Sequence, residues 1–173
     1  MRGANQPPAC QDAVVARAFF DTVADLLVGF LPPDKRAFHH QVTSRSCKVW
    51  YADERVHYEV QLIGRAPLRA AGFDLAEALE VGLHIEHSTA AQSEAFLGSI
   101  AAGSRWRRAL GGDVVAGAFA GRKEHAARWR RISELWPGPG LDSDEAAVEA
   151  AERLARYISV LQPLIDAEPT RRV

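Results

Sequence analysis

The stretch LEVGLHIEH at residues 79–87 has the pattern that decides the fold of this chain. Apolar residues alternate with polar or small ones, which is typical of a β-strand with one side against a core. The apolar side carries Leu79, Val81, Leu83 and Ile85. The segment VHYEVQLI at 56–63 alternates in the same way. We therefore expect two strands of one sheet, each with a polar side that faces away from the core.

Three further segments have the composition of strands, namely 40–52, 114–121 and 127–136. Segments with helical spacing of apolar residues lie before, between and after these strands. A first helix follows Asp12, a second begins at Ser88 or Thr89 and ends at Leu110, and a third runs through the stripe from Ala147 to Ile165. The sequence thus predicts an α+β fold of order α-βββ-α-ββ-α, with a five-stranded antiparallel or mixed sheet and three helices on one face.

Length and composition favour one globular domain. The chain has 173 residues, of which 47% are hydrophobic and 25% are charged, and its net charge is −1. We expect a single domain over residues 10–168, with flexible tails at 1–9 and 169–173. The near-zero charge gives no overall attraction to nucleic acid or to an anionic membrane. The longest largely apolar stretch, VADLLVGFL at 23–31, has only nine residues and contains Asp25. The two cysteines form no CxxC pair, so we expect a cytoplasmic protein without membrane association.

The motif RWRR occurs twice, at 105–108 and at 128–131. Residues 103–136 hold eight Arg or Lys against three acids, whereas residues 141–168 hold seven acids against two arginines. One interpretation is a basic surface that binds phosphates or a protein partner, with stacking by tryptophan. Its candidate residues are Arg105, Arg107, Arg108, Trp129, Arg130 and Arg131. The other interpretation is structural, with arginine stems covering the edge of the core and the acidic helix within residues 141–168 neutralising the charge.

A second set of candidate residues lies on the polar side of the two alternating strands. Each strand carries a His-x-Glu motif, and together they offer His57, Glu59, Glu80, His84 and Glu86. If the strands pair, two imidazoles and several carboxylates converge, which suits zinc, iron or manganese or a general acid/base cluster. The alternative is a polar sheet face exposed to solvent, since the strand register is not fixed by the sequence.

The sequence lacks the motifs of several common enzyme classes. The chain has no Pro-Cys-x-x-Cys pair of a zinc deaminase and no GxGxxG or phosphate-binding P-loop motif. None of its three lysines follows an acidic residue at the spacing of a restriction-type nuclease centre. No catalytic motif is present and we predict no cofactor.

Residues 79–168 resemble a family of uncharacterised bacterial domains found downstream of restriction-endonuclease-like domains. The resemblance is carried by LEVGLHIE, by a helix ending in RALGGDV, by the basic segment ARWRRISEL and by the acidic segment DEAAVEAAERLARYISVLQPLI. It implies an association with DNA processing or defence, and it implies no catalytic residue. The order α-βββ-α-ββ-α is also similar to that of small secretion-type chaperones, which are homodimers that hold partner polypeptides.

Three functions therefore stay open from the sequence. The first is a non-enzymatic interaction module that binds a protein partner or a second copy of itself through the sheet face. The second is a nucleic-acid-binding accessory domain that uses the arginines of the two RWRR motifs. The third is a metal-dependent or acid/base-dependent enzyme that uses the His/Glu residues.

Overall fold

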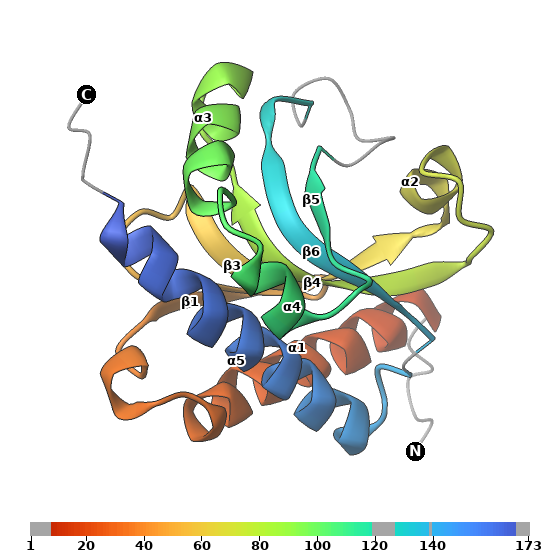
Figure 1. The fold of residues 1–173 in the computed structure, drawn as a ribbon. Coiled ribbons are helices and arrows are strands. Elements are labelled where there is room, and N and C mark those ends of the chain that lie inside the picture. Colours follow the sequence, from red (N-terminus) through yellow and green to blue (C-terminus); the bar gives the residue numbers. More distant parts are fainter. Residues whose placement is uncertain (1–7, 119–126, 139, 169–173) are drawn as a thin grey trace, which may run out of the picture.

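A single antiparallel sheet forms the centre of the computed structural model, which describes residues 8–118, 127–138 and 140–168 (Figure 1). Its strands lie in the order β1-β2-β3-β4-β6-β5, and every neighbouring pair is antiparallel. The strands are β1 (His39–Val42), β2 (Ser46–Trp50), β3 (Val56–Gly64), β4 (Glu77–Ile85), β5 (Val115–Gly117) and β6 (Arg130–Pro137).

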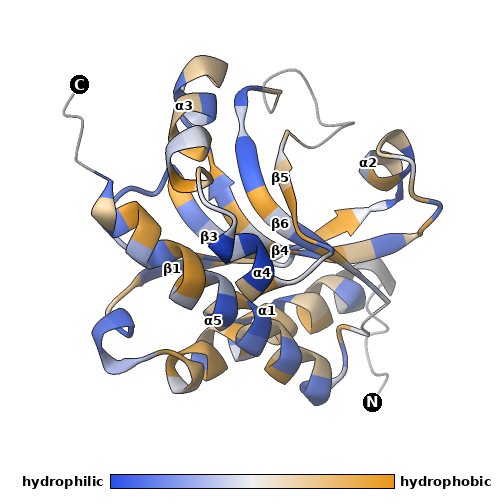
Figure 2. Ribbon diagram, viewed as in Figure 1, coloured by the Kyte–Doolittle hydropathy of each residue, from blue (hydrophilic) through white to orange (hydrophobic). Residues whose placement is uncertain are grey.

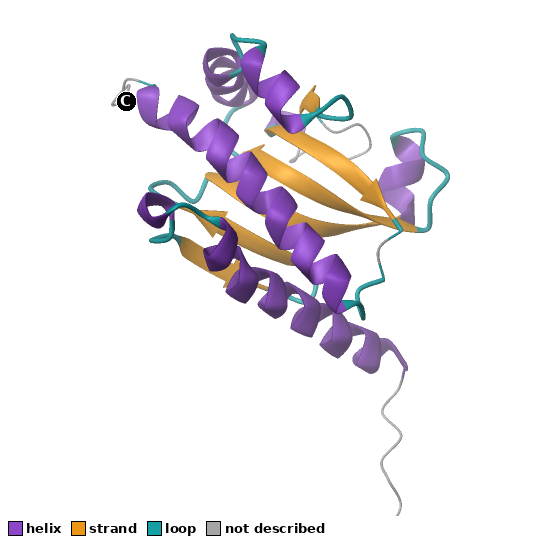
Figure 3. Ribbon diagram, turned by 60° about the horizontal axis from the view of Figure 1, so that its bottom comes forward, coloured by secondary structure: helices purple, strands orange, loops and turns teal. Residues whose placement is uncertain are grey.

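Two long helices, from the two ends of the chain, pack against one face of the sheet and against each other (Figure 3). The helices are α1 (Pro8–Phe30), α2 (Arg65–Ala70), α3 (Ala90–Ile100), α4 (Arg105–Leu110) and α5 (Asp144–Ala167), with a short 3-10 helix, η1 (Pro33–Lys35), after α1. The long pair is α1 and α5, and α3 is the third main helix. No helix in the described ranges is both long enough and apolar enough to cross a membrane.

The α+β class, the antiparallel sheet and the order of the blocks confirm the sequence-based prediction, but the strand count was wrong. The segment 40–52 forms two strands, because the Thr43 hydroxyl accepts hydrogen bonds from the backbone N–H groups of Arg45 and Ser46 and closes a turn. The sheet therefore has six strands where five were expected. The expected second helix is also divided, into α3 and α4, and α2 lies in the connection before β4.

The ends of the predicted elements differ in smaller ways. Helix α1 begins at Pro8, inside the expected tail 1–9, and Asp12 lies within the helix. Thr89 caps α3 through a capping box with Gln92, as expected for this position. Residues 1–7, 119–121 and 169–173, which the predictions assigned to tails and to a strand, lie outside the described residues.

The main core lies between the sheet and the pair α1 and α5. Alternation along the strands directs one set of apolar side chains into it. Figure 2 shows hydrophobic segments on the helices α1 and α5 and on the strands of the sheet. Each large aliphatic side chain buried there stabilises the fold by about 1.5–3 kcal/mol. Central members are Phe20, Val23, Leu27, Tyr58, Val60, Val81, Leu83, Ile132, Leu154, Ile158 and Leu161, all with at most 1% exposure.

A second, smaller apolar cluster lies on the opposite side of the sheet. It joins Leu68 of α2 to Ile63 of β3 and Ala78 of β4, with Leu75 and Leu135 packed around them. Since side chains alternate along a strand, Ile63 shares its side with Glu59, and Ala78 shares its side with Glu80. Helix α2 thus covers one end of the polar side, which is a correction to the expectation that all helices lie on one face.

Gly82 allows β4 and β6 to approach closely in the middle of the sheet. A Cβ atom at this position would lie 2.3 Å from the backbone oxygen of Ile132 and 2.5 Å from the Cα of Ser133. These are backbone atoms of a central strand, so they cannot move away without breaking the ladder. Only glycine fits at position 82.

We expect Gly82→Ala to lower the free energy of unfolding by about 1–3 kcal/mol or more, because the added methyl overpacks the sheet. Urea denaturation followed by circular dichroism measures the change. The matched control is Gly98→Ala in α3, where nothing lies within 4 Å of the added Cβ. The control should keep or gain stability. Equal stability of Gly82→Ala and the wild type would contradict the close approach.

Lys35, just after α1, forms an ion pair with Asp166 near the C-terminal end of α5. Its Nζ donates to Asp166 Oδ2 at 2.8 Å, and Gln162 Nε2 donates to Asp166 Oδ1 at 2.7 Å. The Tyr58 hydroxyl of β3 donates to Gln162 Oε1 at 3.1 Å. Burial tends to raise the pKa of Asp166, but the hydrogen bonds from Lys35 and Gln162 outweigh it, so the pKa of this carboxyl lies below its usual value.

We expect Asp166→Asn to destabilise the protein by less than about 1 kcal/mol at pH 7, since the carboxylate is half exposed. A lowered folded-state pKa stabilises the fold above the unfolded-state pKa of about 3.9, and this contribution is lost as the pH falls through the folded-state value. The difference between wild type and variant should therefore be constant from about pH 5 to pH 8 and shrink below about pH 4. Urea unfolding at several pH values measures it. A difference that grows at low pH would contradict the pairing.

Candidate functional site

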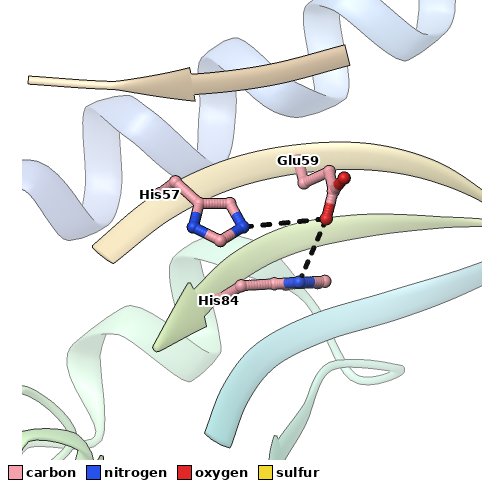
Figure 4. A group of neighbouring side chains, drawn as sticks. All are labelled: His57, Glu59 and His84. Atoms are coloured by element: carbon pink, nitrogen blue, oxygen red, sulfur yellow. Dashed lines mark ion pairs between the residues drawn. The ribbon is translucent and has the colours of Figure 1, made fainter. Parts of the chain in front are cut away.

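The polar side of β3, β4 and β6 presents its side chains in rows across the strands. In the register of the sheet, His57 lies opposite His84, and His84 lies opposite Arg131. The next row consists of Glu59, Gly82 and Ser133, and the third consists of Gln61, Glu80 and Leu135. Because Gly82 has no side chain, the carboxylate of Glu59 lies between the two histidines rather than beside a β4 side chain (Figure 4).

His57, Glu59 and His84 converge on one point. Glu59 Oε2 lies 3.7 Å from His57 Nε2 and 3.2 Å from His84 Nδ1 (Figure 4). One ligand atom from each residue lies within 4.8 Å of the other two. The rings of His57 and His84 have centroids 5.4 Å apart and are tilted by 53°. We call these three residues the His-Glu-His cluster.

A backbone contact fixes the protonation of one ring. His57 Nδ1 lies 2.8 Å from the backbone oxygen of Glu54. A carbonyl oxygen only accepts hydrogen bonds, so Nδ1 carries a proton. In the neutral ring, Nε2 then bears the lone pair, and it is this nitrogen that faces Glu59.

The cluster is buried, which differs from the exposed polar face predicted as one alternative. His57 is 1% exposed, His84 is 6% exposed and the Glu59 side chain is 13% exposed. Burial favours the neutral form of His57, and with the positive field of His84 it lowers the pKa of His57, although the Glu59 carboxylate favours the protonated ring. Burial raises the pKa of Glu59, but its contacts with His57 and His84 outweigh this and hold the pKa well below its usual value. Glu59 is therefore ionised at neutral pH.

Glu80 is the centre of a second buried polar group beside the cluster. It accepts hydrogen bonds from Ser133 Oγ and Gln61 Nε2, both at 2.7 Å, and it forms an ion pair with Arg131. Gln61 Nε2 also lies 3.4 Å from His84 Nε2. Gln61 thus links this group to the His-Glu-His cluster, and a full positive charge offsets the Glu80 carboxylate.

Four of the five predicted His/Glu residues therefore lie together: His57, Glu59, Glu80 and His84. Glu86 does not join them, because β4 ends at Ile85 and the backbone N–H of Glu86 donates to the backbone oxygen of Arg55. Sequence reasoning assigned Arg131 to the basic set and did not consider Ser133. Their alternation with Ile132 along β6 was a signal that both share the side of Glu80.

Most of the predicted basic set is engaged within the fold. Arg105, Arg107 and Arg108 lie on α4, which is mostly hydrophilic in Figure 2. Arg107 stacks on the buried Trp106 at 4.5 Å and donates to the backbone oxygen of Val114. In the second motif Trp129 is half-buried, whereas Arg130 pairs with Glu94 and Arg131 pairs with Glu80.

The charge compensation comes from an unexpected segment. Arg130 and Arg131 are neutralised by acids from the 74–100 region, whereas the acidic helix α5 contributes Arg153, which pairs with Glu134 of β6. Adjacent strand residues point to opposite sides of a sheet, so the two arginines do not share one surface. Binding of nucleic acid by these residues stays a prediction.

Cys47 lies on the other side of the sheet, inside the main core. Burial, with a smaller effect from the negative charge of Glu59, raises the pKa of its thiol to about 12. A thiol with this pKa is protonated at neutral pH and is neither a nucleophile nor a ready metal ligand.

The chain matches no protein-family model, no curated protein and no solved structure. The resemblance noted for residues 79–168 stays a prediction, and function is argued from the geometry.

We expect Glu80→Gln to lower the free energy of unfolding by about 3–5 kcal/mol, because it removes the carboxylate from a buried ion pair. The matched control is Glu94→Gln, which breaks the ion pair of the neighbouring Arg130. Glu94 is 62% exposed, so the control should cost only about 0.2–1 kcal/mol. Urea unfolding of both variants measures the contrast. Equal effects of the two changes would contradict the assignment of Glu80 as the buried charge centre.

Proposed function

We propose that this protein binds a divalent transition-metal ion through His57, Glu59 and His84. The observation that carries the proposal is the convergence of two imidazole nitrogens and one carboxylate oxygen within 4.8 Å of one another. Two imidazoles with one carboxylate form a donor set that suits zinc, iron, manganese or cobalt.

The distances are close to those of a bound ion. Metal–nitrogen and metal–oxygen bonds are about 2.0–2.2 Å long, which places neighbouring ligand atoms about 3–3.5 Å apart. The separations from Glu59 Oε2 are 3.7 Å to His57 and 3.2 Å to His84. The two histidine nitrogens lie within 4.8 Å of each other, so side-chain movements on the order of 1 Å bring all three atoms to the separations of metal ligands.

The surrounding groups support the same conclusion. A metal-binding histidine usually donates its second ring N–H to a backbone carbonyl or a carboxylate. His57 donates Nδ1–H to the backbone oxygen of Glu54, so its Nε2 lone pair is directed at the cluster. His84 Nδ1 also faces the cluster, 3.2 Å from Glu59 Oε2, and it becomes a ligand when metal binding releases its proton.

The balance of buried charge also favours a cation. Glu80 is offset by Arg131, whereas the ion pairs of Glu59 among the described residues are with the two imidazoles alone. A buried carboxylate next to a neutral imidazole is costly unless a positive charge approaches it. A metal ion supplies that charge between the Glu59 oxygen and the Nε2 lone pair of His57.

The other functions inferred from the sequence stay predictions. A carboxylate between two imidazoles is also suited to general acid/base chemistry without a metal. A module that binds a protein partner or a second copy needs an accessible face, and the centre of the polar side is buried in the single chain. The edge strand β1, whose first three residues are exposed, is an accessible part of that side.

Metal binding is tested by titrating zinc or manganese into the tag-free protein in a calorimeter. We expect one ion per chain and a rise in thermal stability, worth about 2.7 kcal/mol when the free ion is at 100 times its Kd. His57→Ala should weaken binding by more than about tenfold, since the variant lacks a direct ligand.

The matched control is His39→Ala. By the register of β1 with β2 and of β2 with β3, His39 lies on the same side of the sheet as Glu59, where it is exposed and stacks on Trp50. This variant should bind the ion as the wild type does. Absence of binding by the wild type, or an equal loss in the two histidine variants, would contradict the proposal.

A further inference from the structure

Exposure of the polar side rises from the centre of the sheet toward β1. Glu80 and Ser133 are buried, Glu59 is 13% exposed, and the side chain of Lys48 on β2 is 17% exposed. On β1, the next strand outward, Gln41 is exposed. A small molecule that reaches Glu59 therefore approaches from the β2 side of the His-Glu-His cluster.

Lys48 of β2 is the positively charged residue on this side of the cluster. It lies directly opposite Glu59 in the β2–β3 register, so the two side chains project from the same side of the sheet. Lys48 is thus a positive charge adjacent to the cluster.

The present partner of Lys48 is easily exchanged. Lys48 Nζ pairs with Glu54 Oε1 at 3.2 Å, and the Glu54 side chain is 58% exposed. An ion pair with one exposed partner is worth about 0.2–1 kcal/mol, less than a charge-assisted hydrogen bond to a bound anion. The ammonium group can therefore leave Glu54 for a ligand at small cost.

We propose that the metal-loaded site binds a small oxyanion, a carboxylate or a phosphate group, between the ion and Lys48. This inference rests on the proposed metal site. Three protein ligands leave at least one coordination position for an exogenous oxygen. A divalent ion with the single carboxylate of Glu59 keeps a net positive charge, and Lys48 adds another, so an anion fits better than a neutral or cationic ligand.

The test uses the full chain loaded with one equivalent of Co²⁺ and freed of excess metal by gel filtration. Acetate and inorganic phosphate are titrated separately while the visible absorption of the bound cobalt is recorded. We expect a saturable spectral change with at least one of the two anions, and the two titrations identify which oxyanion class is preferred. Lys48→Met should weaken that binding by about tenfold, the loss of one charge-assisted contact.

Two further variants separate charge from structure. Lys48→Arg keeps the charge and should bind the anion within a few-fold of the wild type. Lys35→Met removes a lysine that pairs with Asp166 at the end of α5, and it should leave anion binding unchanged. The affinity of Lys48→Met for Co²⁺ should equal or exceed that of the wild type, since a nearby positive charge is lost, whereas a folding defect would lower it.

The outcomes are distinct. Failure of the wild type to bind Co²⁺ overturns the proposed metal site and this inference with it. Binding of Co²⁺ without a saturable response to acetate or phosphate overturns this inference alone. Equal anion affinity of Lys48→Met and the wild type also overturns it, since the bridge to Lys48 is then absent.

Discussion

The register in which β3 pairs with β4 is the constraint on which the rest of the structure depends. The two strands pair antiparallel over nine residues, from Val56 opposite Ile85 to Gly64 opposite Glu77. Because successive side chains alternate, this one register directs Tyr58 and Leu83 into the core beneath α1 and α5 and brings His57 against His84 on the other side. A slip by one residue would exchange the two sides and abolish both the core and the cluster.

The polar side shows a contrast that bears on its role. Beneath α2 the same strands carry Ile63, Ala78 and Leu135, which form an ordinary apolar contact. A few residues along, the side chains become histidines, carboxylates and a buried arginine. Replacing a buried ion pair with well-packed apolar residues often leaves stability unchanged or raises it. Stability of the sheet alone therefore does not require polar residues at these positions. This contrast supports our proposal that the polar residues serve to bind a cation at Glu59 and the two histidines rather than to stabilise the sheet.

Alternation along β3 and β4 was enough to predict the strands and their polar side. It left the convergence of His57, Glu59 and His84 as one of two alternatives, because the sequence does not fix the register in which the strands pair. An alternating pattern does not give the number of strands. The hairpin of β1 and β2 was missed because its turn depends on the hydroxyl of Thr43, within a segment whose composition is typical of a strand throughout. The burial of the cluster and the role of Gly82 also required coordinates, because both depend on how closely β6 approaches β4. In the second RWRR motif, Arg130 and Arg131 are adjacent in sequence and point to opposite sides of a strand, so they belong to different surfaces, and binding of nucleic acid by this motif stays a prediction.

The central claim is that His57, Glu59 and His84 surround one metal ion. X-ray absorption at the zinc edge of the protein loaded with one equivalent of zinc tests it most directly. Our account predicts a first shell of nitrogen and oxygen at about 2.0–2.2 Å, with the multiple-scattering pattern of two imidazoles. A sulfur shell at about 2.3 Å, or a spectrum of oxygen ligands without imidazole, would contradict it.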